Sequence, residues 1–196
     1  MDFKDIIIAT KNRGKVEEFK LLFKDYFKNI YSLLDFDSTP GIVEDQPTFA
    51  GNALKKAEII GKYFNKVTLS DDSGLVVEAL NGAPGTHSAR YAGENATDDD
   101  NLEKLLGEMN AVTNRRAKFV CALALVFPEG KKEVFEGECE GLITEFKRGT
   151  NGFGYDPVFY ISRYEKTMAE LDPDLKNMIS HRSDAVKKLI KFLKNC

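Results

Sequence analysis

The sequence is poor in the side chains that usually build metal centres and disulfide frameworks. Its 196 residues contain only three cysteines and two histidines. Cys121, Cys139 and Cys196 are widely spaced, odd in number and without a CxxC pair, so they support neither a disulfide framework nor a zinc site. His87 and His181 are too few for a histidine-rich metal site. This cysteine usage favours a reducing compartment, and we expect a cytoplasmic protein.

Long apolar runs and a strong charge of one sign are also missing. The longest apolar run, residues 119–127, is far below the roughly 20 residues that span a bilayer. The charged start, residues 1–5, is unlike a secretory signal. A formal net charge of -3 argues against an extended nucleic-acid surface, which needs clustered Lys and Arg. We therefore expect neither a membrane nor a nucleic acid as partner, while a local cluster of cations could still bind a small anion.

The motifs of several large enzyme classes are absent as well. There is no GxSxG elbow, no HExxH, no kinase motif set and no GxGxxG that opens a βαβ unit. A Walker A loop fails because Val16 follows Lys15 and no glycine stands five residues before Gly14. Without repeats, low-complexity tracts or linkers, and with 42% hydrophobic and 30% charged residues, residues 1–196 are expected to form a single globular domain.

The apolar periodicity predicts a mixed α/β fold. Strands are expected at 6–9, 67–70, 119–127 and 132–144, and helices at 49–63, 98–109 and 184–194. An earlier helix is expected from apolar positions at helical spacing between residues 16 and 27. Asn12 is a suitable N-cap for the first helix, and Thr97 or Asp98 for the third. The turn at 128–131 should make the two long strands antiparallel. We predict a mixed central sheet flanked by helices.

Two segments carry charges suited to phosphate chemistry. The loop between the first strand and helix contains Thr10, Lys11, Asn12, Arg13, Gly14 and Lys15, and a helix N-terminus with added cations can bind a phosphate. A solvated basic loop is the alternative. Asp71 and Asp72 end a short apolar strand, where repelling carboxylates would be relieved by a divalent cation such as Mg²⁺. The alternative there is an Asx turn. Glu44 or Asp45 could supply a further ligand.

Two later segments could recognise a base. The stretch 149–157 combines three glycines with Phe153 and Tyr155, so that its backbone can approach a ligand and an aromatic ring can stack on a base. Packing in the core is the alternative for each ring. Lys176, His181 and Arg182 then bring three potential cations in front of the expected last helix.

Taken together and in this order, these segments resemble the inosine triphosphate pyrophosphatase family over nearly the whole chain. The resemblance rests on residues 8–15 with Glu18, residues 48–57, 71–75, 82–85 with 88–91, 152–157 and 180–182. Each motif is weak by itself, but six in register are specific. The resemblance implies an elongated α/β fold of two lobes with a nucleotide cleft between them, a homodimer, and Mg²⁺ as cofactor.

The resemblance also implies roles for individual residues. The triphosphate would be held by Thr10, Asn12 and Lys15, together with Lys56 from a later segment. Lys11, Arg13 and Gly14 belong to the same loop as Thr10. Glu44 and Asp72 would bind Mg²⁺, and Asp72 would accept the proton of the attacking water. The nucleotide site would be shaped by Ser73, Phe153, Gly154, Tyr155, Asp156, Lys176, His181 and Arg182. The assignment of Glu44 is the weakest, because Asp45 is adjacent.

The implied reaction is hydrolysis of non-standard purine nucleoside triphosphates (ITP, dITP and XTP) to the monophosphate and pyrophosphate. Two other hypotheses stay open from the sequence: a related house-cleaning pyrophosphatase for other modified nucleotides, and a nucleotide-binding module without catalysis. The presence of Ser180, His181 and Arg182 argues against the first hypothesis. The presence of Asp71, Asp72 and Lys15 argues against the second.

Overall fold

The structure is a computed structural model that describes residues 4–195. Residues 1–3, on which the expectation about a secretory signal partly rests, and Cys196 lie outside the described part. The described chain divides into two compact units. The first unit comprises residues 4–72, 121–136 and 185–195, and the second comprises 73–120 and 137–184. The single domain, the elongated shape and the cleft stay predictions.

Seven strands form one mixed sheet in the order β2-β1-β3-β4-β5-β6-β7. They are β1 (Asp5–Ile8), β2 (Asn29–Ser32), β3 (Thr68–Val77), β4 (Arg116–Val126), β5 (Lys132–Ile143), β6 (Phe159–Ile161) and β7 (Lys166–Thr167). The pairs β1–β2 and β1–β3 are parallel, whereas β5–β6 and β6–β7 are antiparallel. Backbone bonds from Phe127 N to Lys131 O and from Ile143 N to Arg115 O join β4 and β5 as the predicted antiparallel pair. The predicted mixed α/β class is confirmed.

Five α-helices accompany the sheet in the described residues. They are α1 (Arg13–Phe23), α2 (Phe49–Phe64), α3 (Asp98–Glu108), α4 (Pro173–Ile179) and α5 (His181–Leu193). The N-caps predicted from local sequence are present: the Asn12 side chain accepts from Lys15 N, and Thr97 forms a capping box with Asp100.

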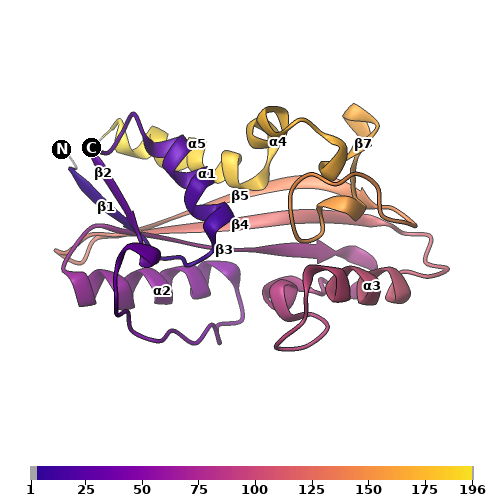
Figure 1. Ribbon diagram of the computed structural model, residues 1–196, viewed down its shortest axis with the longest axis horizontal. Helices are drawn as coiled ribbons and strands as arrows, with labels where there is room; N and C mark the ends of the chain where they lie inside the picture. The colour runs from indigo at the N-terminus through magenta and orange to yellow at the C-terminus, as the bar shows by residue number, and fades with distance from the viewer. Residues whose placement is uncertain (1–3, 196) are drawn as a thin grey trace. The chain divides into compact units, whose positions relative to one another are not determined.

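In the first unit, helices cover both faces of the sheet, with α2 on one face and α1 and α5 on the other (Figure 1). Successive side chains of β4 point to opposite faces. Cys121, Leu123 and Leu125 therefore pack with α1 and α5, while Ala122 and Ala124 pack with α2. This double coverage explains why residues 119–127 are almost wholly apolar.

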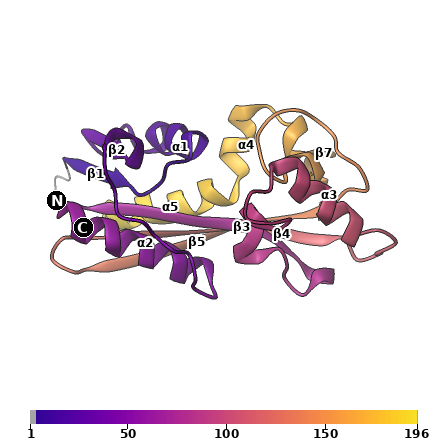
Figure 2. The same cartoon turned by 60° about the horizontal axis from the view of Figure 1, so that its bottom comes forward.

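The second unit has a core of its own, which α3 and the segment that ends in β7 help to enclose (Figure 2). Leu102, Leu105 and Met109 of α3 join this core. So does Tyr155, from the loop that the sequence marked as a candidate base site. The core of the second unit thus reaches directly behind a candidate functional loop.

Two helix boundaries were predicted wrongly. The helix expected to continue to residue 27 ends at Phe23, where Tyr26 N and Phe27 N both bond back to Phe23 O in a closing turn. Phe27 keeps its buried place in the core after that turn. The last helix begins at His181 rather than at residue 184, because Ser180 caps it by accepting a hydrogen bond from Ser183 N at 3.1 Å.

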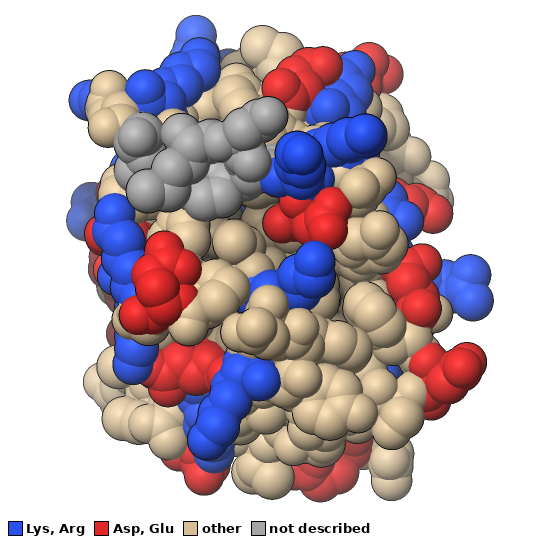
Figure 3. Space-filling view, turned by 90° about the vertical axis from the view of Figure 1, so that its left-hand side faces the viewer, with Lys and Arg blue, Asp and Glu red and all other residues tan. Residues whose placement is uncertain are grey.

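The described surface carries charges of both signs. Figure 3 shows basic and acidic side chains interspersed on one face, so that face has no continuous field of one sign outside the residues drawn in grey. Ion pairs such as Lys66–Asp5 (3.1 Å) contribute to this mixing. Within residues 4–195, no helix is long and apolar enough to cross a membrane.

The contact of α2 with β4 predicts a stability effect. Ala53 is fully buried against Ala122 and Ala124, so Ala53→Leu should overpack this contact and lower the free energy of unfolding by about 1–3 kcal/mol. Urea unfolding measures the loss. Lys62→Leu, at an exposed position of the same helix, is the matched control. Equal midpoints for Ala53→Leu and the native protein would contradict this packing.

Candidate functional site

The adjacent acids Asp71 and Asp72 lie inside β3 and not at its end, which corrects the prediction and its Asx-turn alternative. Both buried carboxylates have partners within the first unit, so the strand can hold them in its interior, and it continues to Val77. Lys15 Nζ lies 2.7 Å from Asp71 Oδ2, and Asn52 Nδ2 donates to Asp72 Oδ2 at 3.0 Å. Alternation along the strand sends the two carboxylates to opposite faces, one toward α1 and the other toward α2.

The predicted phosphate loop precedes α1 and is mostly exposed. Asn12 N donates to Thr10 Oγ1 at 3.2 Å, and Asn12 Oδ1 accepts from Lys15 N at 3.0 Å. These two bonds order the turn into the helix. Lys11, Arg13 and Gly14 lie on the surface there. The helix N-terminus and its cations are therefore available to an anion.

Lys56 of α2 forms an ion pair with Glu44. Its neighbour Lys55 instead pairs with Asp45 at 2.7 Å, and the Asp45 side chain is 54% exposed. Glu44 also acts electrostatically on Asp72, whereas Asp45 does not figure among the charges that shift the pKa of Asp72. The geometry thus favours Glu44 over Asp45 as the acid that belongs to the site.

The charges of this cluster influence one another strongly. Burial lowers the pKa of Lys56, but attraction to Asp71, Glu44 and Asp72 outweighs burial and raises it. Burial raises the pKa of Asp72, and the hydrogen bond from Asn52 lowers it. Repulsion by Glu44 raises it further, so the net effect is a raised pKa. Lys56 therefore stays charged, and Asp72 is a stronger base than an exposed aspartate.

The cluster fits a divalent cation that also binds a phosphate. Three carboxylates, Glu44, Asp71 and Asp72, face two ammonium groups, Lys15 and Lys56, which leaves one negative charge. Among residues 4–195, no group of three or more His, Cys, Asp or Glu side chains could hold a metal ion alone. Mg²⁺ usually takes only one or two carboxylates and completes its shell with waters and phosphate oxygens. The donor set fits that requirement.

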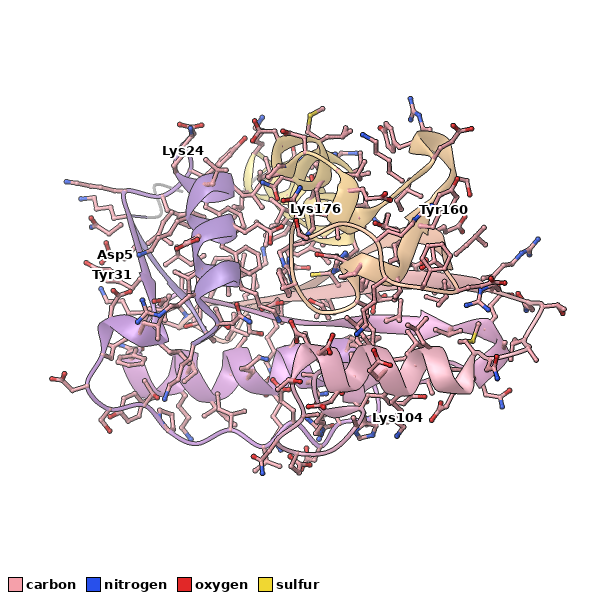
Figure 4. The ribbon with its side chains drawn as sticks, turned by 45° about the vertical axis from the view of Figure 1, so that its right-hand side comes forward. Asp5, Lys24, Tyr31, Lys104, Tyr160 and Lys176 are labelled. Carbon is pink, nitrogen blue, oxygen red and sulfur yellow. The ribbon has the colours of Figure 1, made fainter. Side chains whose placement is uncertain are left out.

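The candidate base residues lie in the second unit, around the loop before β6. Asp156 Oδ2 accepts from Phe153 N at 2.9 Å and from Lys176 Nζ at 2.5 Å. Lys176 extends from α4 (Figure 4) and also lies over the Phe153 ring, 4.9 Å from its centroid. Gly152 has a φ of +82°, and a Cβ there would lie 2.1 Å from Asp156 Oδ2. Only glycine fits beside this carboxylate.

The two aromatic residues of this loop differ in exposure. Phe153 is 44% exposed, so its ring is available for stacking. Tyr155 is buried in the core, and its hydroxyl donates to Ser88 O at 2.8 Å. Gly154 N donates to Asp98 Oδ2 at 2.7 Å, which ties the loop to α3. The structure thus shows Tyr155 packed in the core, and the ligand-binding role of Phe153 stays a prediction.

His181 and Arg182 occupy the first turn of α5. The His181 imidazole is partly exposed and stacks on the Phe119 ring, with centroids 4.9 Å apart and planes 18° apart. Arg182 is 3% exposed. Ser73 follows Asp72 in β3 and is partly exposed. Whether these residues and those of the loop contact a nucleotide stays a prediction.

The structure adds partners that the sequence reasoning did not assign. Asn52 orients Asp72 and also accepts from Gln46 N at 2.9 Å, so it links the acid to the segment that carries Glu44. Its signal was an amide on the otherwise apolar, buried face of α2. The sequence grouped Asp71 with Asp72 as acids whose repulsion a divalent cation would relieve, and the structure shows that Asp71 is the partner of Lys15. Asp98 was considered only as a helix cap.

The fold and this cluster define a mixed α/β protein with lysines and carboxylates arranged as in phosphate-handling sites. The chain belongs to the Ham1 family, whose sequence profile matches residues 6–192. The predicted relationship is thereby confirmed.

Individual relatives agree with this placement. The chain is 52% identical over 188 residues to a protein named dITP/XTP pyrophosphatase from Geobacillus kaustophilus, covering 95% of this chain and 92% of the relative. It is 52% identical over 192 residues to one of the same name from Bacillus licheniformis, covering 97% and 98%. The solved structure of the Staphylococcus aureus Ham1 protein matches with a TM-score of 0.91, 44% identity and coverage of 98% and 99%.

The raised pKa of Asp72 predicts that Asp72→Asn stabilises the protein at neutral pH when EDTA removes divalent cations. The folded carboxyl binds its proton more tightly than the unfolded one, whose pKa is near 3.8. Its contribution is therefore most favourable below that value and is lost as pH rises through the folded pKa. Urea unfolding should show the gain at neutral pH and little difference at about pH 3. Exposed Asp37→Asn is the control, and a neutral-pH midpoint at or below the native one would refute the expectation.

Proposed function

We propose that this protein is a nucleoside triphosphate pyrophosphatase that hydrolyses the non-standard purine nucleotides ITP, dITP and XTP to monophosphate and pyrophosphate. The observation that carries the proposal is the cluster in which Lys15 and Lys56 balance Asp71 and Glu44 beside a basic Asp72. The names of the relatives from Geobacillus and Bacillus support the same reaction.

The triphosphate is assigned to the N-terminus of α1 and to the two lysines. Thr10, Asn12 and the backbone near Gly14 offer donors where the helix dipole is positive. Lys15 and Lys56 neutralise the charge that develops on the pyrophosphate leaving group. Both lysines pair with carboxylates of the cluster, which restrains the positions of their ammonium groups.

The attacking water is assigned to Asp72. A carboxylate whose pKa is raised takes a proton more readily, and general bases contribute on the order of 10²–10⁴-fold in rate. The Asn52 amide donates to Oδ2 of Asp72 and so orients the carboxylate that would accept the proton of the water. Attack at the α-phosphorus then separates monophosphate from pyrophosphate.

Glu44 and Asp72 would hold Mg²⁺, which, when bound, supplies positive charge to the phosphate oxygens. Burial raises the pKa of Asp72, and repulsion by Glu44 raises it further. This repulsion supports the assignment because a cation would relieve it.

The base is assigned to Phe153, Lys176, His181 and Arg182. The exposed Phe153 ring offers a stacking surface, and the N–H groups of the other three side chains could donate to a 6-oxo group. Arginine can donate to O6 and N7 of a 6-oxo purine together, whereas adenine presents an amino group at that position. Rejection of adenine follows from this chemistry, but rejection of guanine does not.

We propose further that the protein acts as a homodimer in the cytoplasm. The dimer rests on the resemblance alone and is tested by light scattering in solution. The proposed cytoplasmic location rests on the spacing of the cysteines. Cys139 is partly buried, and burial raises the pKa of its thiol to about 11. A thiol with such a pKa is unreactive at neutral pH, which suits a reducing compartment. Cell fractionation tests it.

The products test the reaction. With Mg²⁺ present, dITP should yield dIMP and pyrophosphate in equal amounts, which ³¹P NMR measures, and Asp72→Asn should lose at least about 10²-fold in turnover. Formation of mainly dIDP and phosphate would overturn attack at the α-phosphorus. Binding of dITP without any turnover would establish the non-catalytic alternative.

The metal assignment predicts a difference between two neighbouring acids. Glu44→Gln should raise the Mg²⁺ concentration needed for half-maximal activity at least about tenfold, because a ligand charge is lost. Asp45→Asn, whose partner is Lys55, should leave it unchanged. Titration of activity with MgCl₂ at saturating dITP measures both. A larger effect of Asp45→Asn would exchange the two roles.

A further inference from the structure

His181 is the end of a column of three packed rings in the second unit. Its imidazole lies nearly parallel to the Phe119 ring of β4, with centroids 4.9 Å apart. Phe119 in turn packs on Phe159 of β6, with centroids 4.3 Å apart and an angle of 42°. Phe119 and Phe159 are both buried. We call Phe159, Phe119 and His181 the ring column.

The far end of the ring column requires a glycine. A Cβ at Gly141 of β5 would lie 2.6 Å from both Cε1 and Cζ of Phe159 and 2.7 Å from Tyr160 O. Real Cβ contacts are essentially never that short. The requirement concerns space rather than backbone conformation, because Gly141 does not have a positive φ. Its missing side chain leaves the room that the Phe159 ring occupies.

We propose that Gly141, Phe159 and Phe119 are positioning residues that set the plane of the His181 imidazole for recognition of a 6-oxo purine. The inference rests on the proposed function, since it takes His181 as a base contact. A hydrogen bond weakens steeply when its angle departs from linear, so an imidazole that donates must hold its ring plane. Stacking on a buried ring restricts rotation of the imidazole about its outer bond.

The role is distinct from ordinary packing in the core. Phe36 and Phe64 in the first unit form a similar ring pair, 4.2 Å apart at 36°, with no proposed base residue on it. Removal of either pair weakens packing. Only a change in the Phe119–Phe159 pair should alter which base the enzyme selects, because of the two pairs only this one contacts His181.

The first readout is the imidazole itself and needs no turnover. The chain has two histidines, so NMR of histidine-labelled protein gives two sets of ring signals, and His87→Gln assigns them. The His181 ring protons should show the upfield shift of a nucleus above an aromatic face. Phe119→Leu should abolish this shift and Gly141→Ala should change it, while the signals of exposed His87 stay in place.

The second readout is base selection, measured as the ratio of kcat/KM for ITP to that for ATP. Phe119→Leu and Gly141→Ala should each lower this ratio about tenfold, the effect of one misaligned hydrogen bond. The loss should come from ITP and not from ATP. The controls are Phe64→Leu and Gly107→Ala, since a Cβ at Gly107 meets nothing within 4 Å. Both controls should keep the native ratio.

His181→Ala separates failure of this inference from failure of the proposed function. An unchanged ITP to ATP ratio in His181→Ala would remove His181 from base recognition. A lowered ratio in His181→Ala, together with native ratios in Phe119→Leu and Gly141→Ala, would overturn the positioning role alone. Gly141→Ala keeps all three rings, so it carries the same test if Phe119→Leu does not fold.

Discussion

The burial of two adjacent carboxylates inside β3 is the constraint on which the first unit depends. Asp71 is fully buried and Asp72 is 7% exposed, and a buried charge without a partner would cost several kcal/mol. The chain meets this requirement from two directions. Lys15 arrives with the N-terminus of α1 on one face of the strand, and Asn52 arrives with α2 on the other. The pairs that compensate the buried charges therefore also place the N-terminus of α1 and the lysine-bearing helix α2 beside β3.

This arrangement trades some stability for chemistry. A raised pKa means that the folded protein disfavours the charged form of Asp72, and a well-packed apolar residue would be more comfortable there. An apolar residue, however, can neither accept a proton nor bind a cation, whereas an ionised carboxylate can do both. Lys56 shows the complementary effect, since its surroundings favour its charge despite burial. The site carries one negative charge in excess, which a divalent cation would balance.

Local signals made much of the fold predictable, and distant partners explain what was missed. Asn12 and Thr97 cap their helices as expected because a cap needs only the following turn. Asp71 and Asp72 resembled a strand end because their partners are remote in sequence; Asn52, for example, lies 20 residues away. The motifs also singled out Glu44, but its choice over Asp45 needed geometry. Lys55 and Lys56 point in different directions from one helix, and each takes a different acid.

In the second unit, the candidate residues are restrained by an ion pair and by ring stacking. Lysine has a long flexible side chain, so an unrestrained ammonium group could move away from the amino group of adenine. Asp156 binds both Lys176 and the backbone of Phe153, so the proposed donor and the proposed stacking ring share one anchor. His181 is restrained by a buried ring. A donor that cannot move must either meet an acceptor or remain unsatisfied, and that penalty is what lets a polar site tell an oxo group from an amino group.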